Sequence, residues 1–358
     1  MREYRIAAIP GDGIGPDVIE AGLEVLRALE ARGGGFKLHV TTYPWGSDYY
    51  RRHGRMMAAD ALDHLKPADA IYFGAVGAPD VPDHVTLWGL RLAICQGFDQ
   101  YANVRPTRVL PGIESPLRRC RPGDLDWVIV RENSEGEYAG AGGRVHWGLP
   151  DEVGLDVAVF TRTGVERILR FAFELARKRP RRRLTVVTKS NAQRHGMVMW
   201  DDVYQRVQAD YPEVASDKML VDAMTTRMVL KPETIDVVVA TNLHADILSD
   251  LAAALAGSIG IAPTANLNPE GKFPSMFEPI HGSAFDITGK GVANPIAAFW
   301  TASMMLEHLG EAAAAKGLMA AIERVTGAGG VLTPDLGGRA TTREVTDAVC
   351  AAIAGVNA

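Results

Sequence analysis

The sequence predicts an α/β protein in which a largely parallel central sheet is covered by helices. Apolar runs of strand length alternate with amphipathic helical stretches along most of the 358 residues. Glycine, proline and polar residues separate these runs, and a hydrophobic content of 47% supports a full core. The length suits two domains or one large α/β unit.

The apolar run Tyr4–Pro10 is expected to form the first strand, and the turn GDGIGP leads from it into a helix beginning at Asp17. Residues at helical spacing give that helix one apolar face: Val18, Gly22, Val25, Leu26 and Leu29. Helices are also expected near Asp60–Leu65 and over the amphipathic segment VERILRFAFELA. Further apolar runs predict strands at Phe36–Thr42, Ala70–Val76, Trp127–Val130, Gly154–Phe160, Leu184–Thr188, Asp217–Val221 and Ile235–Ala240.

The turn GDGIGP lies where a dinucleotide fingerprint would lie, but its spacing differs from that fingerprint. The glycines read G-x-G-x-G, Pro16 occupies the third glycine's place, and no acidic residue closes the next strand. We therefore reject an ordinary Rossmann dinucleotide site. The glycine-rich segment Gly136–Pro150 contains two aromatic residues and precedes a strand, which favours an extended arm that packs on another surface.

Composition excludes several classes of function. Lysine plus arginine total 38 and aspartate plus glutamate 43, so a net charge of −5 gives no general attraction to nucleic acid or anionic membrane. The basic run Arg177–Arg183 closes a predicted helix and is interpreted as a solvated helix end, not an RNA-binding surface. No signal peptide or membrane span is indicated. Cys95, Cys120 and Cys350 are odd in number and far apart, which fits a reducing cytoplasm.

The segment Thr241–Asp250, TNLHADILSD, is the strongest candidate for a metal site. It follows a predicted strand and opens a helix on which Asp246 and Asp250, four residues apart, share one face. Ile247 and Leu248 suit the packed side. Two such carboxylates repel each other unless a cation lies between them, and hard oxygen ligands suit Mg²⁺ or Mn²⁺. The spacing alone also fits a solvated helix face, so the interpretation depends on the rest of the chain.

Other residues supply the chemistry of a small anionic substrate. Arg105 in YANVRP and Arg131 in VIVRENSEGEY adjoin apolar runs and are expected at strand ends, where a guanidinium can hold a carboxylate through two hydrogen bonds. Lys189, at the end of the strand TVVT, is a candidate base, and Tyr138 a candidate acid. Asp222 closes another apolar strand and is a third candidate metal ligand. Lysine and tyrosine are also common at the ends of elements for structural reasons alone.

The segment Phe277–Pro295, FEPIHGSAFDITGKGVANP, is a candidate cofactor loop. Its glycines allow backbone N–H groups to wrap a polar cofactor, with Asp286 on the ribose hydroxyls. A carboxylate at that place repels a 2′-phosphate and favours NAD over NADP. The same composition also fits a plain loop rich in turn formers.

Taken together, these motifs resemble a known family. GDGIGP, FDQYANVRP, RENSEGEYAG, VTKSN, VDAM, NLHADILSDLAAALAGSIG and EPIHGSAFDITGKGVANP occur in this order and cover essentially the whole chain. They are similar to the β-decarboxylating dehydrogenases, which act on isopropylmalate, isocitrate, D-malate or tartrate. The forms LWG, ENSEGEY and MVMWDDVY most resemble the tartrate and D-malate branch.

The resemblance implies a non-Rossmann, isocitrate/isopropylmalate dehydrogenase-like fold, in which two α/β domains share a mostly parallel central sheet. Residues 1–103 and 257–358 would form the cofactor-binding domain. Residues 104–256 would form the dimerisation and substrate domain, with an arm near 140–160. A homodimer is implied, with arms interlocked through the Gly140 region.

The resemblance also implies a role for each candidate residue. The cleft would borrow Lys189, Asn191 and Asp222 from the partner subunit. The cofactors would be NAD and Mg²⁺ or Mn²⁺, and some relatives also need K⁺. The remaining implied roles are Asp246 and Asp250 on the metal, Arg105 and Arg131 on the substrate carboxylates, Lys189 as base, Tyr138 as proton donor, and Ile14, Ala75, Asn191, His281, Gly282, Ser283, Ala284, Asp286, Ala293 and Asn294 at the NAD site.

One position departs from the family pattern. The arginine that usually stands ten residues before Arg105 is replaced by Cys95. Arg91, one helical turn earlier on the same face, is the candidate substitute; otherwise the substrate needs only two arginines.

The expected activity is oxidation and oxidative decarboxylation of a four-carbon 2-hydroxy diacid. The segment LWGLRLAICQ shows neither an apolar pocket for isopropylmalate nor a group for the third carboxylate of isocitrate. Those two acids remain alternative substrates. A non-catalytic regulatory subunit is an alternative of another class, disfavoured because the metal and base residues are all present.

Overall fold

The computed structural model describes residues 1–33, 35–121 and 123–355, which divide into two compact units. Unit 1 consists of Met1–Gln100, Val109–Arg118 and Ala253–Ala358. Unit 2 consists of Tyr101–Arg108 and Arg119–Ala252. Unit 1 is therefore built from both ends of the chain, and it also takes up the short segment Val109–Arg118, which the division drawn from the sequence placed in the other domain.

Unit 1 contains five strands in the order β2-β1-β3-β12-β11. Neighbouring strands are parallel, except that β11 and β12 are antiparallel. The strands are β1 (Arg2–Gly11), β2 (Phe36–Thr42), β3 (Ala70–Ala75), β11 (Pro263–Leu267) and β12 (Ser275–Pro279). The helices are α1 (Gly15–Ala31), α2 (Ser47–His53), α3 (Ala61–Leu65), α4 (Asp83–Thr86), a π-helical turn (Leu87–Arg91), α5 (Leu92–Gly97), α10 (Ile296–His308), α11 (Ala312–Ala328) and α12 (Thr342–Ala354).

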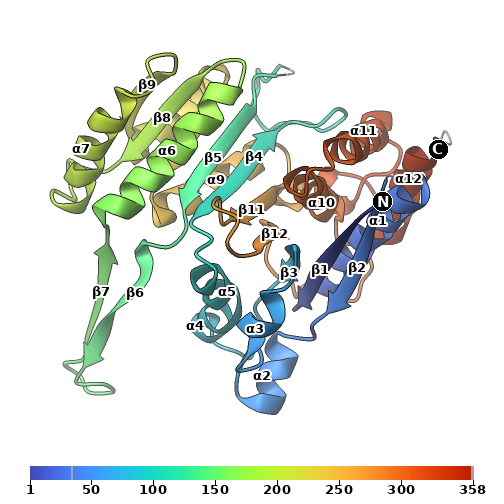
Figure 1. The fold of residues 1–358 in the computed structure, drawn as a ribbon, viewed down its shortest axis with the longest axis horizontal. Coiled ribbons are helices and arrows are strands. Elements are labelled where there is room, and N and C mark those ends of the chain that lie inside the picture. The colour runs from blue at the N-terminus through green and yellow to red at the C-terminus, as the bar shows by residue number, and fades with distance from the viewer. Residues whose placement is uncertain (34, 122, 356–358) are drawn as a thin grey trace. The chain divides into compact units, whose positions relative to one another are not determined.

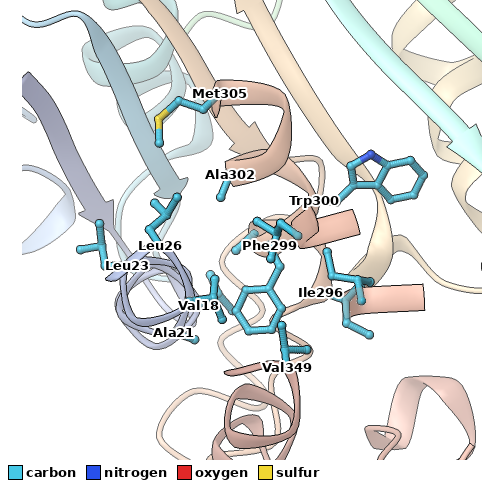
Figure 2. Packing of buried hydrophobic residues seen from close by; sticks show 14 of the residues in the cluster. Val18, Ala21, Leu23, Leu26, Ile296, Phe299, Trp300, Ala302, Met305 and Val349 are labelled. Atoms are coloured by element: carbon cyan, nitrogen blue, oxygen red, sulfur yellow. The ribbon is translucent and has the colours of Figure 1, made fainter. Parts of the chain in front are cut away.

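Strands β3, β11 and β12 and the middle of β1 are buried on both faces, whereas the edge strand β2 is mostly exposed or half-buried. Ile6 and Ala8 of β1 belong to one core, shared with α1, α10, α11 and α12, whereas Ala7 and Ile9 belong to a second core on the opposite face. Figure 2 shows the first core, where Phe299 of α10 lies among side chains of α1 and α12. Burial on both faces is the reason that β1 and β3 read as apolar runs instead of alternating patterns.

The predicted apolar face of α1 is confirmed, because all five of its residues are buried. The helix packs closely on β3: a Cβ atom added at Gly22 would lie 1.9 Å from the hydroxyl oxygen of Tyr72. That hydroxyl is itself buried and donates a hydrogen bond of 2.8 Å to the carbonyl oxygen of Ala298. A side chain at Gly22 therefore cannot be accepted without displacing a bonded, buried tyrosine.

Unit 2 contains five strands in the order β4-β5-β10-β8-β9 and a separate two-stranded ribbon, β6-β7 (Figure 1). Within the five, β4 and β5 are antiparallel and the other pairs are parallel. The strands are β4 (Ala102–Arg108), β5 (Asp126–Glu132), β6 (Gly136–Val145), β7 (Val153–Val159), β8 (Arg183–Thr188), β9 (Ala215–Leu220) and β10 (Val237–Ala240). The helices are α6 (Arg162–Lys178), α7 (Gly196–Gln208), α8 (Val221–Leu230) and α9 (Asn242–Leu255).

Several expectations need correction. The segment Gly136–Pro150, expected to form an extended arm, was not predicted as a strand, but most of it forms β6, which pairs with the predicted strand β7. Asp222 does not close a strand, because β9 ends at Leu220 and Asp222 lies in the first turn of α8, where an acidic residue is favoured by the helix dipole. Strands β4, β11 and β12 were not predicted, since buried polar residues such as Asn103 and Asn266 interrupt their apolar pattern.

Two further observations concern the surface. The basic run begins in the last turn of α6. Two of its arginines beyond the helix, Arg179 and Arg181, are not simply solvated, because they pair with Asp126 and with the buried Asp236. None of the helices within the described residues combines the length and the apolar character that crossing a membrane requires.

Gly22→Ala should lower the free energy of unfolding by about 1–3 kcal/mol, because the new methyl group collides with Tyr72. The matched control is Gly317→Ala in α11, where an added Cβ meets nothing within 4 Å. There alanine should leave stability unchanged or raise it by up to about 1 kcal/mol, through its higher helix propensity. Urea denaturation of both variants measures the difference, and equal stability of the two would contradict this account of the α1–β3 packing.

Candidate active site

Helix α9 carries the two carboxylates that the sequence singled out. Asp246 and Asp250 lie one turn apart on it, and burial together with the charge of Asp246 raises the pKa of the Asp250 carboxyl. The charges of the nearby arginines oppose this shift. The expectation for the residues between them is half right: Leu248 is fully buried, whereas Ile247 is 55% exposed. A pair of like charges held in a partly desolvated place fits a cation as its partner.

Two buried arginines bind Asp246. Arg131 donates from Nη1 to Asp246 Oδ1, and Arg105 donates to the same oxygen from its own Nη1 at 3.2 Å. Both arginines come from the antiparallel pair β4 and β5, Arg105 from the middle of β4 and not from its end. Their side chains are 5% and 3% exposed, whereas that of Asp246 is 34% exposed. The arginines are thus fixed in the interior, and the carboxylate is the part that solvent reaches.

Neighbouring amides orient these guanidinium groups. Asn103 accepts a 2.8 Å bond from Nε of Arg105, and Asn242 accepts a 2.8 Å bond from Nε of Arg131. Ser249 accepts a further bond of 2.5 Å from Arg105 Nη1. Sequence reasoning did not assign these three residues. Asn103 could have been found, since it stands two positions before Arg105 and strand side chains alternate between faces.

Tyr138, the candidate acid, and Lys189, the candidate base, contact different carboxylates. The Tyr138 hydroxyl donates to Asp246 Oδ2 at 3.3 Å, and the Arg131 guanidinium lies over the tyrosine ring at 5.3 Å. Lys189 follows β8 directly and pairs with Asp222, whose pKa is lowered by this hydrogen bond. Among the described residues of one chain, no three His, Cys, Asp or Glu side chains gather closely enough to hold a metal ion.

A buried histidine adjoins this cluster and was also not assigned from the sequence. His244, in the first turns of α9, is 7% exposed, and burial lowers its pKa. The charge of Glu137 opposes that shift and the charge of Lys189 adds to it. The structure therefore gives α9 a buried histidine that is neutral near pH 7.

In unit 1, three segments expected at a cofactor site meet. The GDGIGP turn packs against the HGSAF loop: Ile14 N donates to Ser283 O at 2.8 Å, and a Cβ at Gly13 (φ +60°) would lie 1.9 Å from that same oxygen. On its other side the turn is tied to β3, because Asp12 N donates to Ala75 O at 2.9 Å. The backbones of these segments are thus held close together, as backbone recognition of a polar cofactor requires.

The loop itself presents an unsatisfied acceptor. His281 is buried and its pKa is lowered by burial, so the ring is neutral near pH 7. Its Nδ1 lies 3.0 Å from the carbonyl oxygen of Gly282 and must carry the proton, while Nε2 has no hydrogen-bond partner among the described residues. Such an orphaned atom fits an N–H or O–H donor of a bound ligand.

The other residues of the predicted cofactor set divide into exposed and buried members. Asp286 is exposed, as a group that contacts ribose hydroxyls would be. Asn294 is buried and fixed, because Nδ2 donates to Asp335 at 2.9 Å and its Oδ1 accepts from Ile296 N at 3.0 Å. Ala284 adopts a positive φ of 41°, and Ala293 is buried beneath the loop. Asn191, in unit 2, is exposed.

Arg91, the candidate third arginine, lies in unit 1 with a partner of its own. Its Nε and Nη2 donate to Glu278 Oε1 at 2.8 and 2.7 Å, and Nη2 also lies 3.3 Å from Asn266 Oδ1. The pair is almost fully buried. Cys95, at the position of the usual family arginine, is buried one turn further on. The charge of Arg91 is therefore balanced by Glu278 within the same unit.

Comparison with known proteins shows the family to which this chain belongs. The sequence pattern of the isocitrate/isopropylmalate dehydrogenase family matches residues 5–349. The chain is 74% identical to an Agrobacterium vitis protein named "Probable tartrate dehydrogenase/decarboxylase TtuC", covering 100% of this chain and 98% of the relative. It is 53% identical to the D-malate dehydrogenase [decarboxylating] of Escherichia coli (strain K12), covering 98% of each. The crystal structure of isocitrate dehydrogenase from Methylococcus capsulatus superposes with a TM-score of 0.88 at 33% identity, covering 98% of this chain and 99% of that one.

Glu132, next to Arg131, is a buried carboxyl without a basic partner in its hydrogen bonds. Burial raises its pKa from 4.5 to about 7, although Ser134 and the backbone N–H of Glu135 donate to it. The folded state therefore binds this proton more tightly than the unfolded state does. Between pH 4.5 and about 7 the folded state carries more protons, so stability from this group is lost as the pH rises through that window.

Glu132→Gln removes this titration while keeping the acceptor oxygen for Ser134. The free energy of unfolding of the variant, relative to the native chain, should therefore rise by roughly 2–3 kcal/mol as the pH increases across the window. Denaturant unfolding at the two ends of the window measures it. Parallel pH profiles for the two proteins would show that Glu132 ionises normally in the folded state.

Proposed function

Because the chain belongs to the isocitrate/isopropylmalate dehydrogenase family, we propose that it oxidises and decarboxylates a four-carbon 2-hydroxy diacid with NAD and a divalent metal ion. The single observation that carries this proposal is the convergence of Arg105, Arg131 and Tyr138 on Asp246. Two guanidinium groups match the two carboxylates of such an acid. The names of the Agrobacterium and Escherichia relatives favour tartrate isomers and D-malate.

The donors on α9 fit a hard cation. Asp246 and Asp250 offer oxygen ligands one turn apart. Burial, and after it the charge of Asp246, raise the pKa of Asp250 against the opposing charges of the arginines. With Asp222 supplied by the partner subunit, three carboxylates and substrate oxygens would complete the site of Mg²⁺ or Mn²⁺. When bound, the ion stabilises negative charge that develops on the oxygen at C2 of the substrate. Some members of the family also require K⁺, and K⁺ is proposed as an additional cofactor.

The residues of unit 1 fit NAD. His281 presents an unpartnered acceptor, the Ser283 and Ile14 backbones are held together, and Asp286 is exposed where a ribose hydroxyl would bind. The carboxylate of Asp286 would repel the extra phosphate of NADP. NAD supplies the hydride acceptor, and the remaining loop residues (Ala75, Gly282, Ala284, Ala293, Asn294, and the partner's Asn191) line its site.

Different side chains bind the substrate, remove a proton from it and return a proton to the product. Arg105 and Arg131 hold the substrate carboxylates, and Lys189 removes the proton of the C2 hydroxyl as hydride leaves C2. Oxidation gives a β-keto acid, which loses CO₂, and Tyr138 then donates a proton to the resulting enolate. The hydrogen bond from Tyr138 to Asp246 supports this role. Arg91 is the candidate third contact, but its pairing with Glu278 makes two arginines sufficient in this proposal.

We further propose a homodimer in the cytoplasm. The ribbon β6-β7 exposes apolar side chains that a lone chain leaves in water, including Trp147 at 74%, Leu155 at 61% and Val145 at 58%. Interlocking two such ribbons would bury them. In the same dimer Lys189 and Asp222, which pair with each other within one chain, would serve the partner's site.

The rival proposals concern the substrate or the absence of catalysis. Isopropylmalate needs an apolar side pocket, and isocitrate needs a group for a third carboxylate. The buried pair of Arg91 with Glu278 offers neither an apolar surface nor an unbalanced positive charge. A regulatory subunit without activity remains the alternative of another class, and the following assay separates all of these.

NADH formation with D-malate, the tartrate isomers, 3-isopropylmalate and isocitrate, each with Mn²⁺, tests the function. We expect turnover of D-malate and at least one tartrate isomer, and its loss with EDTA. Asp246→Asn should reduce kcat/KM by about a hundredfold or more, since it removes a metal ligand. The exposed Asp202→Asn in α7 is the matched control and should retain full activity. Turnover of isocitrate or isopropylmalate alone would refute the substrate, and inactivity of the folded protein on every acid would favour the regulatory subunit.

Complementation tests whether the site is shared between subunits. Lys189→Met and Asp246→Asn should each be inactive, but heterodimers formed by coexpression combine an intact α9 with an intact lysine at one of their two sites. Random mixing should restore roughly one quarter of native activity. Asp246→Asn mixed with Asp250→Asn is the control, because both changes lie on α9 and no site is complete. Absence of rescue in the first mixture, with heterodimers demonstrated, would show that each site belongs to one chain.

A further inference from the structure

The buried ion pair of Arg91 and Glu278 joins the segment before α5 to the end of strand β12. Arg91 is the last residue of the π-helical turn, and its neighbours Leu90 and Cys95 belong to the same core cluster as Met276 of β12. Side chains two residues apart on a strand share a face, so Glu278 lies on the same side of the sheet as Met276 and meets the guanidinium there. Arg91 therefore connects two elements of unit 1.

The contact combines two charges with several hydrogen bonds. Glu278 Oε1 accepts from Arg91 Nε at 2.8 Å and from Nη2 at 2.7 Å, and Asn266 Nδ2 donates to the same oxygen at 2.7 Å. The two charged side chains are 10% and 5% exposed. Among the described residues, Arg91 is the cation that pairs with Glu278. Removing the guanidinium would leave a buried carboxylate without a counter-charge, which is strongly unfavourable.

The candidate cofactor loop begins directly after this ion pair. Strand β12 ends at Pro279, two positions before His281, and it runs parallel to β3, whose last residue is Ala75. The ends of both strands therefore lie at the same edge of the sheet. His281 is buried, and its orphaned Nε2 atom can accept a hydrogen bond from a ligand only while the ring is neutral. The acceptor offered to the cofactor thus depends on the protonation of one imidazole.

Two carboxylates act on that imidazole. Burial lowers the pKa of His281, whereas the charges of Asp335 and Glu278 oppose this shift. Asp335 accepts hydrogen bonds from two hydroxyl groups and an amide, none of which carries a charge. Glu278 differs, because it is paired with a guanidinium. Arg91 therefore offsets one of the two negative charges that favour the protonated ring.

We propose that Arg91 is a positioning residue of the cofactor site, which by its ion pair with Glu278 fixes the end of β12 and keeps His281 as a hydrogen-bond acceptor for NAD. Without the guanidinium, the buried charge of Glu278 would favour a protonated imidazole. A protonated Nε2 donates a hydrogen bond and can no longer accept one. Arg91 thus acts on the cofactor through Glu278, and not on the diacid through direct contact. This inference rests on the use of NAD in the proposed function.

Calorimetric titration of NAD, without diacid or metal ion, tests this role. We expect Arg91→Gln to bind NAD about tenfold more weakly than the native protein at about pH 6, and to regain most of the difference at about pH 8, where the ring loses its proton. Arg91→Lys keeps the charge and should bind NAD within about threefold of the native protein. The control is Arg51→Gln, an exposed arginine of the same unit paired with Asp80, which should leave the affinity unchanged. Equal affinity of Arg91→Gln and the native protein at both pH values would overturn the inference.

A double variant separates the action through Glu278 from a general loss of structure. Arg91→Gln combined with Glu278→Gln removes both charges, so NAD affinity should return to within about threefold of the native value at about pH 6. This variant buries no unpaired charge of the pair, and it therefore also tests the inference where Arg91→Gln alone does not fold. Weak NAD binding by the folded double variant would show that Arg91 does not act through Glu278.

The diacid gives an independent readout. At saturating NAD, the KM for D-malate in Arg91→Gln should stay within about twofold of the native value. A raised KM for D-malate with unchanged NAD affinity would make Arg91 a substrate contact and would overturn the inference. Normal NAD binding by a native protein that turns over none of the acids would overturn the proposed reaction alone. Failure of the native protein to bind NAD would overturn the proposed cofactor, and this inference with it.

Discussion

The ion pair between Asp246 and the buried arginines of β4 and β5 is the constraint on which the candidate site depends. Two guanidinium groups inside a sheet need both hydrogen-bond acceptors and a negative charge. Two elements provide these partners. Strand β4 contributes Asn103, and helix α9 contributes Asn242, Asp246 and Ser249. The polar face of α9 is therefore required by the strands it packs on, and the proposed use of Asp246 as a metal ligand would draw on a group that the fold already needs.

In unit 1 the candidate cofactor site is formed by backbone segments that lie close together. The turn after β1 is tied to Ser283 on one side and to β3 on the other, and Asp12 accepts bonds from Ser47 and Gly77 to close it. Because all these groups bond to one another, the turn is rigid before any ligand binds. His281 is the exception, since its Nε2 atom has no partner among the described residues. A rigid frame with one unsatisfied acceptor is suited to selective recognition of a polar cofactor.

Secondary structure was predictable wherever burial left a simple pattern. The strands buried on both faces, such as β3 and β10, read directly as apolar runs, and the helical spacing of α1 gave its buried face. Prediction failed where function or long-range pairing placed polar groups inside. Strand β4 carries Asn103 and Arg105 in its interior, so its composition resembled a loop. Ile247 is exposed although its apolar side chain suggested packing.

The sequence by itself determined the residue types, their order and the local elements, and these were enough to identify the family and nearly every candidate site residue. Only the tertiary structure decided which charges meet. Asp246 is bonded to Arg105, 141 positions away, whereas Lys189 pairs with Asp222 and Arg91 with Glu278. No local pattern records these choices, because an ion pair depends on the distance between side chains from separate strands and helices. That distance is set by strand register and helix packing, which arise from the whole chain.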